Sequence, residues 1–298
     1  MRMEGVSLRD SNLTNRNYLD QILVEQRLVD AAVPDLHVTL LGKTFSTPVM
    51  SAAFSHLDHG DTHYAAHLSH AFQQCGALNW WGMSTDAEMQ EIYQAAPDTV
   101  EIIKPYCEEE RIHARIDFAL AHGALAVGMD IDHAFNRDGF HDRVHELEME
   151  PKSMEQLRKY IGWAGKTPFV VKGVLSVTDA LKCRDAGVKA IVVSHHHGIY
   201  PFAVPPLMVL PAIREAVGNS MEIYADCGIE SGADAFKALC LGADAVGISR
   251  HILEIVRASG EEGVAMELQK MNGELRALMA RTGMRTVKDT GADVLWNL

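Results

Sequence analysis

A run of three histidines, SHHHG at residues 194–198, directly follows an apolar stretch and is the most unusual feature of the sequence. Neighbouring side chains of a strand point to opposite faces, so the three imidazoles cannot all serve one site. Either His196 alone, or His195 together with His197, faces it. An imidazole with a pKa of about 6.5 suits proton abstraction at neutral pH, so we favour a general base over a metal ligand and expect no metal here.

Ionisable side chains also end other apolar runs of the sequence. An unpaired charge at such a place is costly to bury, so each side chain needs a charged partner, a bound ligand or solvent. A single ionisable side chain at the end of a strand is explained as a strand cap or by a hydrogen bond to a neighbouring loop. Six such side chains together indicate a common ligand site. The six are Asp132, Lys172, His195, His196, Asp226 and Arg250.

Short apolar runs alternate with segments of helical spacing, which is the pattern of βα units and a parallel sheet. Eight such units predict an α/β fold of the (β/α)8 TIM-barrel class, in one domain over residues 1–298, with its active site where the strands end. We expect residues 1–45 to pack across the bottom or side of the barrel. Trp80 and Trp81, at the end of the second strand, either line an apolar pocket or belong to the core. The predicted strands are Thr47–Ala53, Ala77–Gly82, Thr99–Lys104, Leu125–Asp132, Pro168–Val174, Ala190–His196, Glu222–Gly228 and Ala245–Arg250.

Two glycine-rich turns late in the sequence predict a phosphate site. They cover Asp226–Gly232 and Gly242–Arg250, after the seventh and eighth predicted strands. Glycines let backbone N–H groups approach phosphate oxygens, and a helix N-terminus with Arg250 supplies positive potential. Lys172, near the end of the fifth strand, either places its ammonium against an electron-rich cofactor ring such as a flavin or pairs with a carboxylate at the rim.

The composition excludes several classes of protein. A chain of 298 residues with 47% hydrophobic and 22% charged residues fits a soluble globular protein. The formal net charge of -13 argues against a nucleic-acid-binding surface, which would be basic. Five cysteines without metal-ligand spacing indicate reduced thiols in a cytoplasm. The first residues lack the apolar core of a signal peptide, and no apolar run approaches the roughly 20 residues that span a bilayer, so we expect neither export nor membrane insertion.

Longer stretches of the chain resemble the FMN-dependent 2-hydroxy-acid oxidases and dehydrogenases, which include glycolate oxidase, lactate oxidase and mandelate dehydrogenase. The resemblance covers nearly the whole chain. Its most specific parts are VVKGVLSVTDALKCRDAGVKAIVVSHHHG at residues 170–198 and YADCGIESGADAFKALCLGADAVGISR at residues 224–250. Residues 15–53 resemble the first part of the family's barrel, and residues 274–289 resemble its closing helix. The resemblance therefore implies the barrel fold and FMN as the cofactor.

Carried over by position, the resemblance implies roles for individual residues. His196 falls on the histidine that removes the substrate's hydroxyl proton, Asp132 on the carboxylate that orients this histidine, and Tyr106 on an active-site tyrosine. Lys172 falls on the lysine beside the flavin ring, and Lys104 replaces the glutamine that usually contacts the flavin. The other flavin-contacting positions are Ala52, Ala53, Ser194, Asp226, Gly228, Gly247 and Arg250.

Two departures from the family pattern concern charged groups. The arginine that grips the substrate carboxylate in the family is Ile199 here, and an isoleucine cannot hold a carboxylate. An arginine of the phosphate site is Glu230, which weakens one phosphate contact. Substrate recognition must therefore differ. Arg137 or His133, in a shorter loop than the family usually has, are the candidate substrate anchors, and the alternative is that both are solvated loop residues.

Three functions stay open from the sequence. The leading one is an FMN-dependent oxidoreductase acting on a 2-hydroxy acid or a related alcohol or amine, with oxygen, a quinone or a carrier protein as electron acceptor. The second is an isomerase resembling the type 2 isopentenyl diphosphate isomerases, which use reduced FMN without net redox change. The third is a barrel that binds FMN without turnover. The resemblance also implies a homotetramer.

Overall fold

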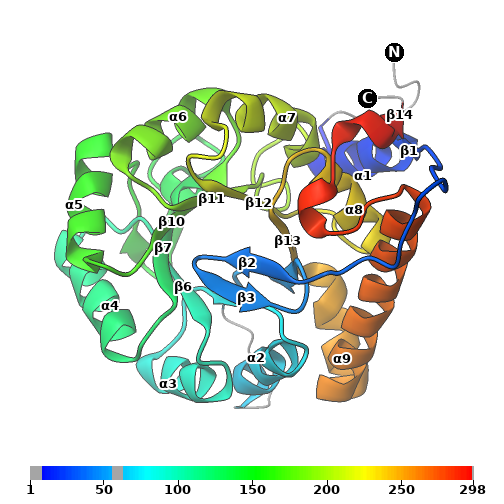
Figure 1. The fold of residues 1–298 in the computed structure, drawn as a ribbon. Coiled ribbons are helices and arrows are strands. Elements are labelled where there is room, and N and C mark those ends of the chain that lie inside the picture. The colour runs from blue at the N-terminus through cyan, green and yellow to red at the C-terminus, as the bar shows by residue number, and fades with distance from the viewer. Residues whose placement is uncertain (1–8, 56–62, 297–298) are drawn as a thin grey trace.

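The computed structural model describes residues 9–55 and 63–296, and its central feature is an eight-stranded parallel sheet rolled into a barrel (Figure 1). The first and last strands of the sheet meet through a parallel bridge between Phe54 and Trp81 and a hydrogen bond of 3.1 Å from Ser51 N to Leu78 O. All eight predicted strands are present with shorter bounds, which confirms the predicted (β/α)8 barrel. They are β4 (Val49–Ser51), β5 (Asn79–Trp81), β6 (Thr99–Ile103), β7 (Ala126–Asp130), β10 (Phe169–Val174), β11 (Ala190–Val193), β12 (Glu222–Ala225) and β13 (Ala245–Ile248).

Helices surround the barrel and cover the outer face of the sheet (Figure 1). Serine or threonine side chains accept hydrogen bonds at the N-termini of four of them, and Ser153 forms a reciprocal capping box with Gln156. These caps fix where each helix begins after its loop. The helices are α2 (Tyr64–Gln74), α3 (Asp86–Ala95), α4 (Glu109–Ala121), α5 (Met154–Ala164), α6 (Val177–Ala186), α7 (Pro206–Val217), α8 (Gly232–Cys240) and α9 (Arg250–Arg281).

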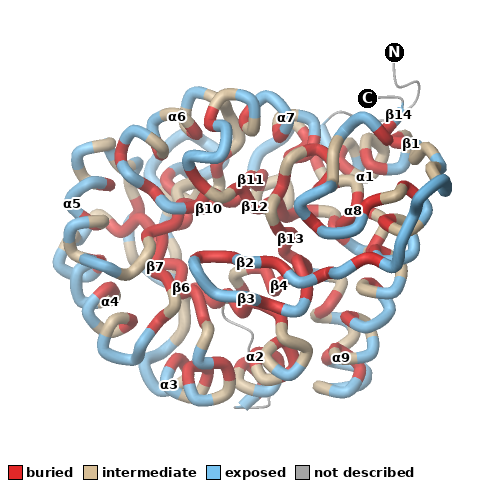
Figure 2. The backbone as a smooth tube through the Cα atoms, in the orientation of Figure 1, coloured by how far each residue is buried: buried red, intermediate tan, exposed pale blue. Residues whose placement is uncertain are grey.

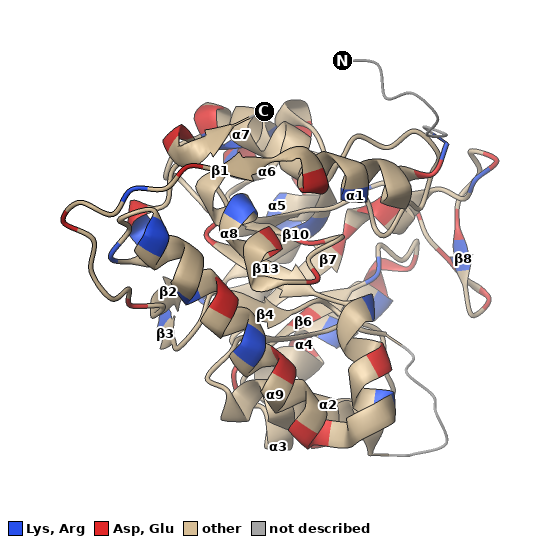
Figure 3. Ribbon diagram, turned by 90° about the vertical axis from the view of Figure 1, so that its right-hand side faces the viewer, with Lys and Arg blue, Asp and Glu red and all other residues tan. Residues whose placement is uncertain are grey.

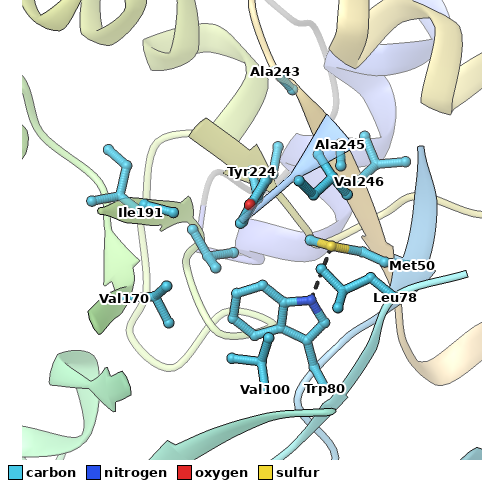
Figure 4. Packing of buried hydrophobic residues seen from close by; sticks show 14 of the residues in the cluster. Met50, Leu78, Trp80, Val100, Val170, Ile191, Tyr224, Ala243, Ala245 and Val246 are labelled. Carbon is cyan, nitrogen blue, oxygen red and sulfur yellow. Dashed lines mark hydrogen bonds between the residues drawn. The ribbon is translucent and has the colours of Figure 1, made fainter. Parts of the chain in front are cut away.

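The barrel strands are buried (Figure 2), and large apolar side chains pack against one another inside the barrel (Figure 4). Trp80 and Trp81 are fully buried. The indole N–H of Trp80 donates to Met50 Sδ at 3.0 Å, and its ring meets the ring of Tyr224 edge-on at 5.5 Å between centroids. Burying one such side chain contributes roughly 1.5–3 kcal/mol. The two tryptophans therefore belong to the core, and the alternative of a pocket lining was wrong.

The N-terminal segment contacts the barrel at two places. The hairpin of β2 (Val38–Leu40) and β3 (Lys43–Phe45) lies across the end where the strands begin, and Leu41 N donates to the Glu222 carboxylate at 3.0 Å (Figure 1). Helix α1 (Ser11–Gln21) lies beside the loops that follow β11 and β12, as Asn15 Nδ2 donates to Cys227 O at 2.9 Å. The segment thus covers the bottom, as expected, and also reaches the rim. The remaining N- and C-terminal elements are β1 (Leu23–Val24), η2 (Val287–Asp289), η3 (Ala292–Val294) and β14 (Leu295–Trp296).

The loop after β7 carries a short 3-10 helix, η1 (Ile131–Ala134), and then a small hairpin of β8 (Arg143–Val144) and β9 (Leu147–Glu148). Figure 3 shows this hairpin projecting at the edge of the molecule. Within residues 9–55 and 63–296, none of the helices has the length and apolar character that crossing a membrane requires.

Candidate active site

Four strands deliver charged side chains to the rim where the barrel strands end. Asp130 is the last residue of β7, and it lies beside Lys172 of β10 in the parallel register. The Lys172 ammonium lies 3.7 Å from a carboxylate oxygen of Asp130 and 3.7 Å from one of Asp226, after β12. Lys104, after β6, donates to Asp130 at 2.8 Å. All four side chains are buried, so their charges interact in a medium of low dielectric constant.

The backbone after β11 takes an unusual turn that presents His196. His196 and His197 both have left-handed backbones, with φ of 48° and 54°. Such a conformation costs of order 1–3 kcal/mol for a residue with a side chain, and it persists only where surrounding contacts hold it. Here His196 N donates to Ser194 Oγ at 3.1 Å, and His197 N donates to Cys227 Sγ at 3.4 Å. The turn lifts the His196 ring out of the strand and directs it toward η1.

The His196 imidazole has polar partners at both ring nitrogens. Its Nδ1 lies 2.9 Å from Asp132 Oδ1, 3.5 Å from Asp130 Oδ1 and 3.3 Å from Lys172 Nζ. Its Nε2 lies 3.2 Å from His133 Nε2. The structure thus brings Asp132 and His196 together, as expected. It also adds Asp130, which was not among the predicted site residues although it lies in the same apolar run, two residues before Asp132.

Burial and neighbouring charges set the protonation of this cluster. Burial and Lys172 lower the pKa of His196, but Asp130 and Asp132 outweigh them and raise it to about 9. Burial and Asp130 raise the pKa of Asp132 to about 6. Burial alone would raise the pKa of Asp130, but Lys104, Lys172 and His196 hold it well below its usual range. Asp130 is therefore the permanent anion of the cluster.

Gly173 makes room for the Asp132 carboxylate. Its φ is +91°, a conformation that side chains rarely allow, and a Cβ atom there would lie only 2.6 Å from Asp132 Cγ. The next strand position after Lys172 must therefore be glycine for Asp132 to pack against β10 and reach His196. The sequence alone gave no sign of this contact.

His133 and Arg137, the two candidate substrate anchors, lie in different surroundings. The His133 ring meets the His196 ring edge-on at 4.4 Å between centroids, and its Nδ1 lies 3.1 Å from Asp142 Oδ2. Burial, followed by Lys104, lowers the pKa of His133 to about 4, so this ring is neutral at neutral pH. Arg137 is exposed.

A hollow of about 650 Å³ adjoins this cluster at the rim, between α5, α6 and the loops after β7 and β11. Arg137, Asp132 and Ile199 all line it. The residue that replaces the family's carboxylate-binding arginine thus faces the same hollow as a carboxylate partner of His196. The other lining residues are mostly apolar and include Ile131, Ala134, Phe135, Met154 and Leu157.

The predicted cofactor residues of β4, β12 and β13 lie next to one another. A Cβ atom on Gly247 would lie 3.4 Å from Asp226 Cβ and 3.6 Å from Ala52 Cβ. Ala53 follows Ala52 and is half-buried, and Ser194 is buried at the end of β11. These small side chains leave the backbone of the rim open to a flat ligand.

The two halves of the predicted phosphate cradle differ. At α8, Gly232 N donates to Glu274 at 2.8 Å and Glu230 N donates to Asp234 at 3.2 Å, so carboxylates already occupy this N-terminus. Gly228, before it, has a φ of +75° and packs against α1. At α9, whose first residue is Arg250, no side chain of the described residues caps the helix, and the first turn has no acidic residue. An anion therefore meets fewer carboxylates at the N-terminus of α9 than at that of α8.

Tyr106 follows β6, two residues after Lys104. Its ring is buried 5.7 Å from the Arg111 guanidinium, and among residues 9–55 and 63–296 its hydroxyl has no hydrogen-bond partner. Burial raises the pKa of this phenol, and it stays protonated at neutral pH. Among residues 9–55 and 63–296, no hydrogen bond joins Tyr106 to His196, and the catalytic role of Tyr106 stays a prediction.

Among the described residues, three buried polar atoms of the rim accept or donate no hydrogen bond. They are Asp132 Oδ2, His195 Nε2 and Asp130 Oδ1, the last of which has longer ion-pair contacts to His196 and Lys172. Buried polar atoms normally form hydrogen bonds, so these three indicate a place where a polar ligand binds. Together with the small residues on β4 and β13, the two lysines and the free N-terminus of α9, they fit a flavin phosphate.

The rim also has ligand-type atoms for a cation. Asp130, Asp132, His133 and His196 offer atoms within 4.8 Å of one another. The buried ammonium groups beside Asp130 disfavour a further cation by charge repulsion. That no metal binds at His196 stays a prediction.

Comparison with known proteins decides the family. The sequence model of the family described as FMN-dependent dehydrogenase matches residues 4–164 and 140–297, which together cover nearly the whole chain. The chain belongs to this family. The expected family and its cofactor, FMN, are thereby confirmed.

Curated and solved relatives agree with this assignment. An FMN-dependent alpha-hydroxy acid dehydrogenase of Penicillium citrinum is 38% identical over 156 residues, or 51% of this chain and 38% of the relative. An L-lactate dehydrogenase of Stenotrophomonas maltophilia is 40% identical over 148 residues, or 49% of this chain and 38% of the relative. The alignments thus span less than half of these relatives. A mandelate oxidase variant with a C4a-OH-FMN adduct matches with a TM-score of 0.83 and 26% identity, over 98% of this chain and 92% of that one.

Proposed function

We propose that this member of the FMN-dependent dehydrogenase family oxidises a small substrate at a carbon that bears a hydroxyl or amine, with a 2-hydroxy acid as the leading class. The observation that carries the proposal is His196, held by two carboxylates beside the buried Lys172. The relatives named above are hydroxy-acid dehydrogenases and oxidases, and none of them is an isomerase. An oxidoreductase function is therefore better supported than an isomerase function.

His196 is the proposed base. With its Nδ1 directed to Asp132, the neutral ring presents the Nε2 lone pair to the substrate and accepts the hydroxyl proton there. The two carboxylates then stabilise the imidazolium that forms. Bound FMN supplies the acceptor for the hydride equivalent that leaves the substrate carbon. A hydroxyl that reaches Nε2 must lie beside His133, which supports a place for His133 in substrate binding.

The two buried lysines are the proposed flavin partners. Lys172 and Lys104 place positive charge at the rim, where it favours the negative charge that a flavin gains on reduction. In the free protein, Asp130 and Asp226 balance this charge. The remaining proposed cofactor contacts lie just after β4, β11 and β12, on β13 and at the start of α9. They are Ala52, Ala53, Ser194, Asp226, Gly228, Gly247 and Arg250.

The hollow between α5 and α6 is the proposed substrate pocket. Its apolar lining suits a hydrocarbon substituent, and Arg137 is the proposed partner of a substrate carboxylate at its exposed side. This arrangement differs from the family pattern, because the residue at position 199 cannot bind a carboxylate.

A flavin-bleaching screen tests the function. Anaerobic addition of 2-hydroxy acids, amino acids and alcohols, each with small or large apolar substituents, is followed by the loss of oxidised-flavin absorbance. We expect bleaching with one class, and Ile199→Arg should lower KM for small 2-hydroxy acids by about 10-fold or more, since a charge-assisted hydrogen bond contributes about 1.5–3 kcal/mol. A purified protein that is colourless and takes up no FMN contradicts FMN as the cofactor. Turnover that occurs only with pre-reduced FMN, without net electron transfer, indicates an isomerase instead of an oxidoreductase.

The pH dependence follows from the His196 pKa. His196 must be neutral to accept a proton, so kcat/KM should rise with pH until about 9. The folded-state pKa is above the unfolded value of about 6.5. The stabilisation from the charged ring is therefore fully present below about pH 6.5 and is lost as the pH rises through about 9. Removing one of the two carboxylates by Asp132→Asn should move the kcat/KM limb to lower pH, and a limb that does not move contradicts Asp132 as a partner of the base.

The assembly and compartment are part of the same proposal. We propose one FMN-binding domain over residues 1–298, a homo-oligomer such as a tetramer, and a reducing, cytoplasmic compartment, with the electron acceptor left open among oxygen, a quinone and a carrier protein. The five unpaired cysteines support the compartment, and the exposed Phe140 and Phe202 on rim loops support subunit contacts. Light scattering of the purified protein measures the oligomeric state.

A further inference from the structure

Cys107, His141 and Glu148 form a second cluster of ligand-type side chains, outside the proposed active site. Their ligand atoms all lie within 4.8 Å of one another, and His141 Nδ1 lies 3.3 Å from Glu148 Oε1. A thiolate, an imidazole and a carboxylate are the side chains that bind Zn²⁺, and ligand atoms around a tetrahedral zinc lie roughly 3.5 Å apart. The cluster therefore has the donors and nearly the spacing of a three-ligand zinc site.

Backbone pairing holds the three side chains together. Cys107 N donates to Glu148 O at 2.9 Å, and Tyr106 forms an antiparallel bridge with Met149, so the segment after β6 runs alongside the end of β9. His141 lies just before β8, which pairs with β9. Binding a metal here requires only small side-chain rotations, because the backbone has already brought the ligands close.

Carboxylates and cations both lie around the cluster. Glu148 Oε2 lies 3.6 Å from Arg143, so its Oε1 stays directed to His141. Glu150, the other carboxylate near Cys107, already pairs with Lys152 at 2.7 Å, which leaves Glu148 as the carboxylate available to a metal. A divalent cation binds cysteine as the thiolate, so its binding releases the thiol proton. The His141 and Glu148 side chains are 42% and 46% exposed, which leaves the fourth position open to water.

We propose that Cys107, His141 and Glu148 bind a zinc ion that fastens the β8–β9 hairpin to the segment after β6. The hairpin projects at the edge of the molecule (Figure 3), and backbone hydrogen bonds from Cys107 to Glu148 and from Glu150 to Pro105 already join its base to that segment. Asp142, the residue after His141, holds His133 at the active site through a contact of 3.1 Å. The ion therefore fixes the position of a residue that contacts the proposed base.

Metal analysis of the full-length, FMN-loaded protein tests the proposal without any assay of activity. After incubation with ZnCl2 and gel filtration, we expect about one zinc ion per chain. Cys107→Ser should lose the zinc, and Glu148→Gln should weaken binding by more than the roughly 10–100-fold that changes around a metal site cause. Cobalt in place of zinc should give a thiolate-to-cobalt absorption band that Cys107→Ser removes. Zinc should also slow proteolysis within residues 141–149.

Cys75→Ser is the matched control, because Cys75 is a half-buried cysteine at the end of α2 and far in sequence from the cluster. This variant should bind zinc as the wild type does. Circular dichroism of each variant shows that the barrel is folded. Wild-type protein that emerges from gel filtration without zinc, or Cys107→Ser that binds zinc as tightly as the wild type, overturns the proposal.

Discussion

His196→Asn should lower the rate of flavin reduction by substrate by about 10²–10⁴-fold, the usual contribution of a positioned general base. The carboxamide has no basic nitrogen to accept the hydroxyl proton. Asparagine tolerates the left-handed backbone of this position, so the turn after β11 should survive. Single-turnover bleaching under anaerobic conditions measures the rate, and the visible flavin spectrum measures retained FMN.

His197→Asn is the matched control for this experiment. His197 is the neighbouring histidine and has a similar left-handed backbone, but its main-chain contact is with Cys227 and its ring has no carboxylate within 4.0 Å among the described residues. We expect its bleaching rate to stay within about threefold of the wild type, as for a side chain without a role in proton transfer. A His196→Asn protein that bleaches at the wild-type rate would show that another group is the base.

Lys172→Met should destabilise the free protein by about 3–5 kcal/mol, because removing one partner of a buried ion pair leaves charges without compensation. The lost ammonium lies between Asp130 and Asp226, and both carboxylates are buried. Lys104 still pairs with Asp130, so the uncompensated charge falls mainly on Asp226. Urea unfolding followed by far-UV circular dichroism measures the change.

The same variant has a second expected effect, on chemistry. Lys172 lowers the pKa of His196, so its removal should raise that pKa and shift the rise of kcat/KM to still higher pH. The flavin should also become harder to reduce, because one positive charge near the reduced ring is lost. Lys270→Met is the control: this lysine is exposed on α9 and pairs with Glu267, and its loss should change stability by less than about 0.5 kcal/mol. Equal stability of the two variants would contradict the charged cluster.

Much of the fold follows from local pattern. Eight apolar runs and the helical segments between them predict the barrel, because the interior strands of a parallel sheet are apolar along their length. The same pattern places Lys172, Ser194 and Asp226 at strand ends, and parallel strands all end at one rim. The placement of these three residues at strand ends follows from the strand pattern alone, without any particular side-chain contact, and the structure confirms it.

The contacts within the rim required the tertiary structure. Asp130 and Asp132 are two residues apart, and both carboxylates contact the His196 ring. The sequence could not predict these two contacts, because they depend on the path of η1 and on the space that Gly173 leaves for Asp132. His133 and His196 are 63 residues apart and meet only because two loops fold over the same rim.

The same limit applies to other residues near the rim. Tyr106 follows β6, but a position after a strand does not fix the direction of a side chain, and its ring lies 5.7 Å from the Arg111 guanidinium. The glycines before α8 suggested a phosphate site, but Glu274, from the distant α9, takes one of its N–H groups. The sequence by itself thus determined the barrel, the rim and the chemical types gathered there. Only the tertiary structure decided which of them touch, because contacts depend on loop paths and rotamers that have no periodic signal.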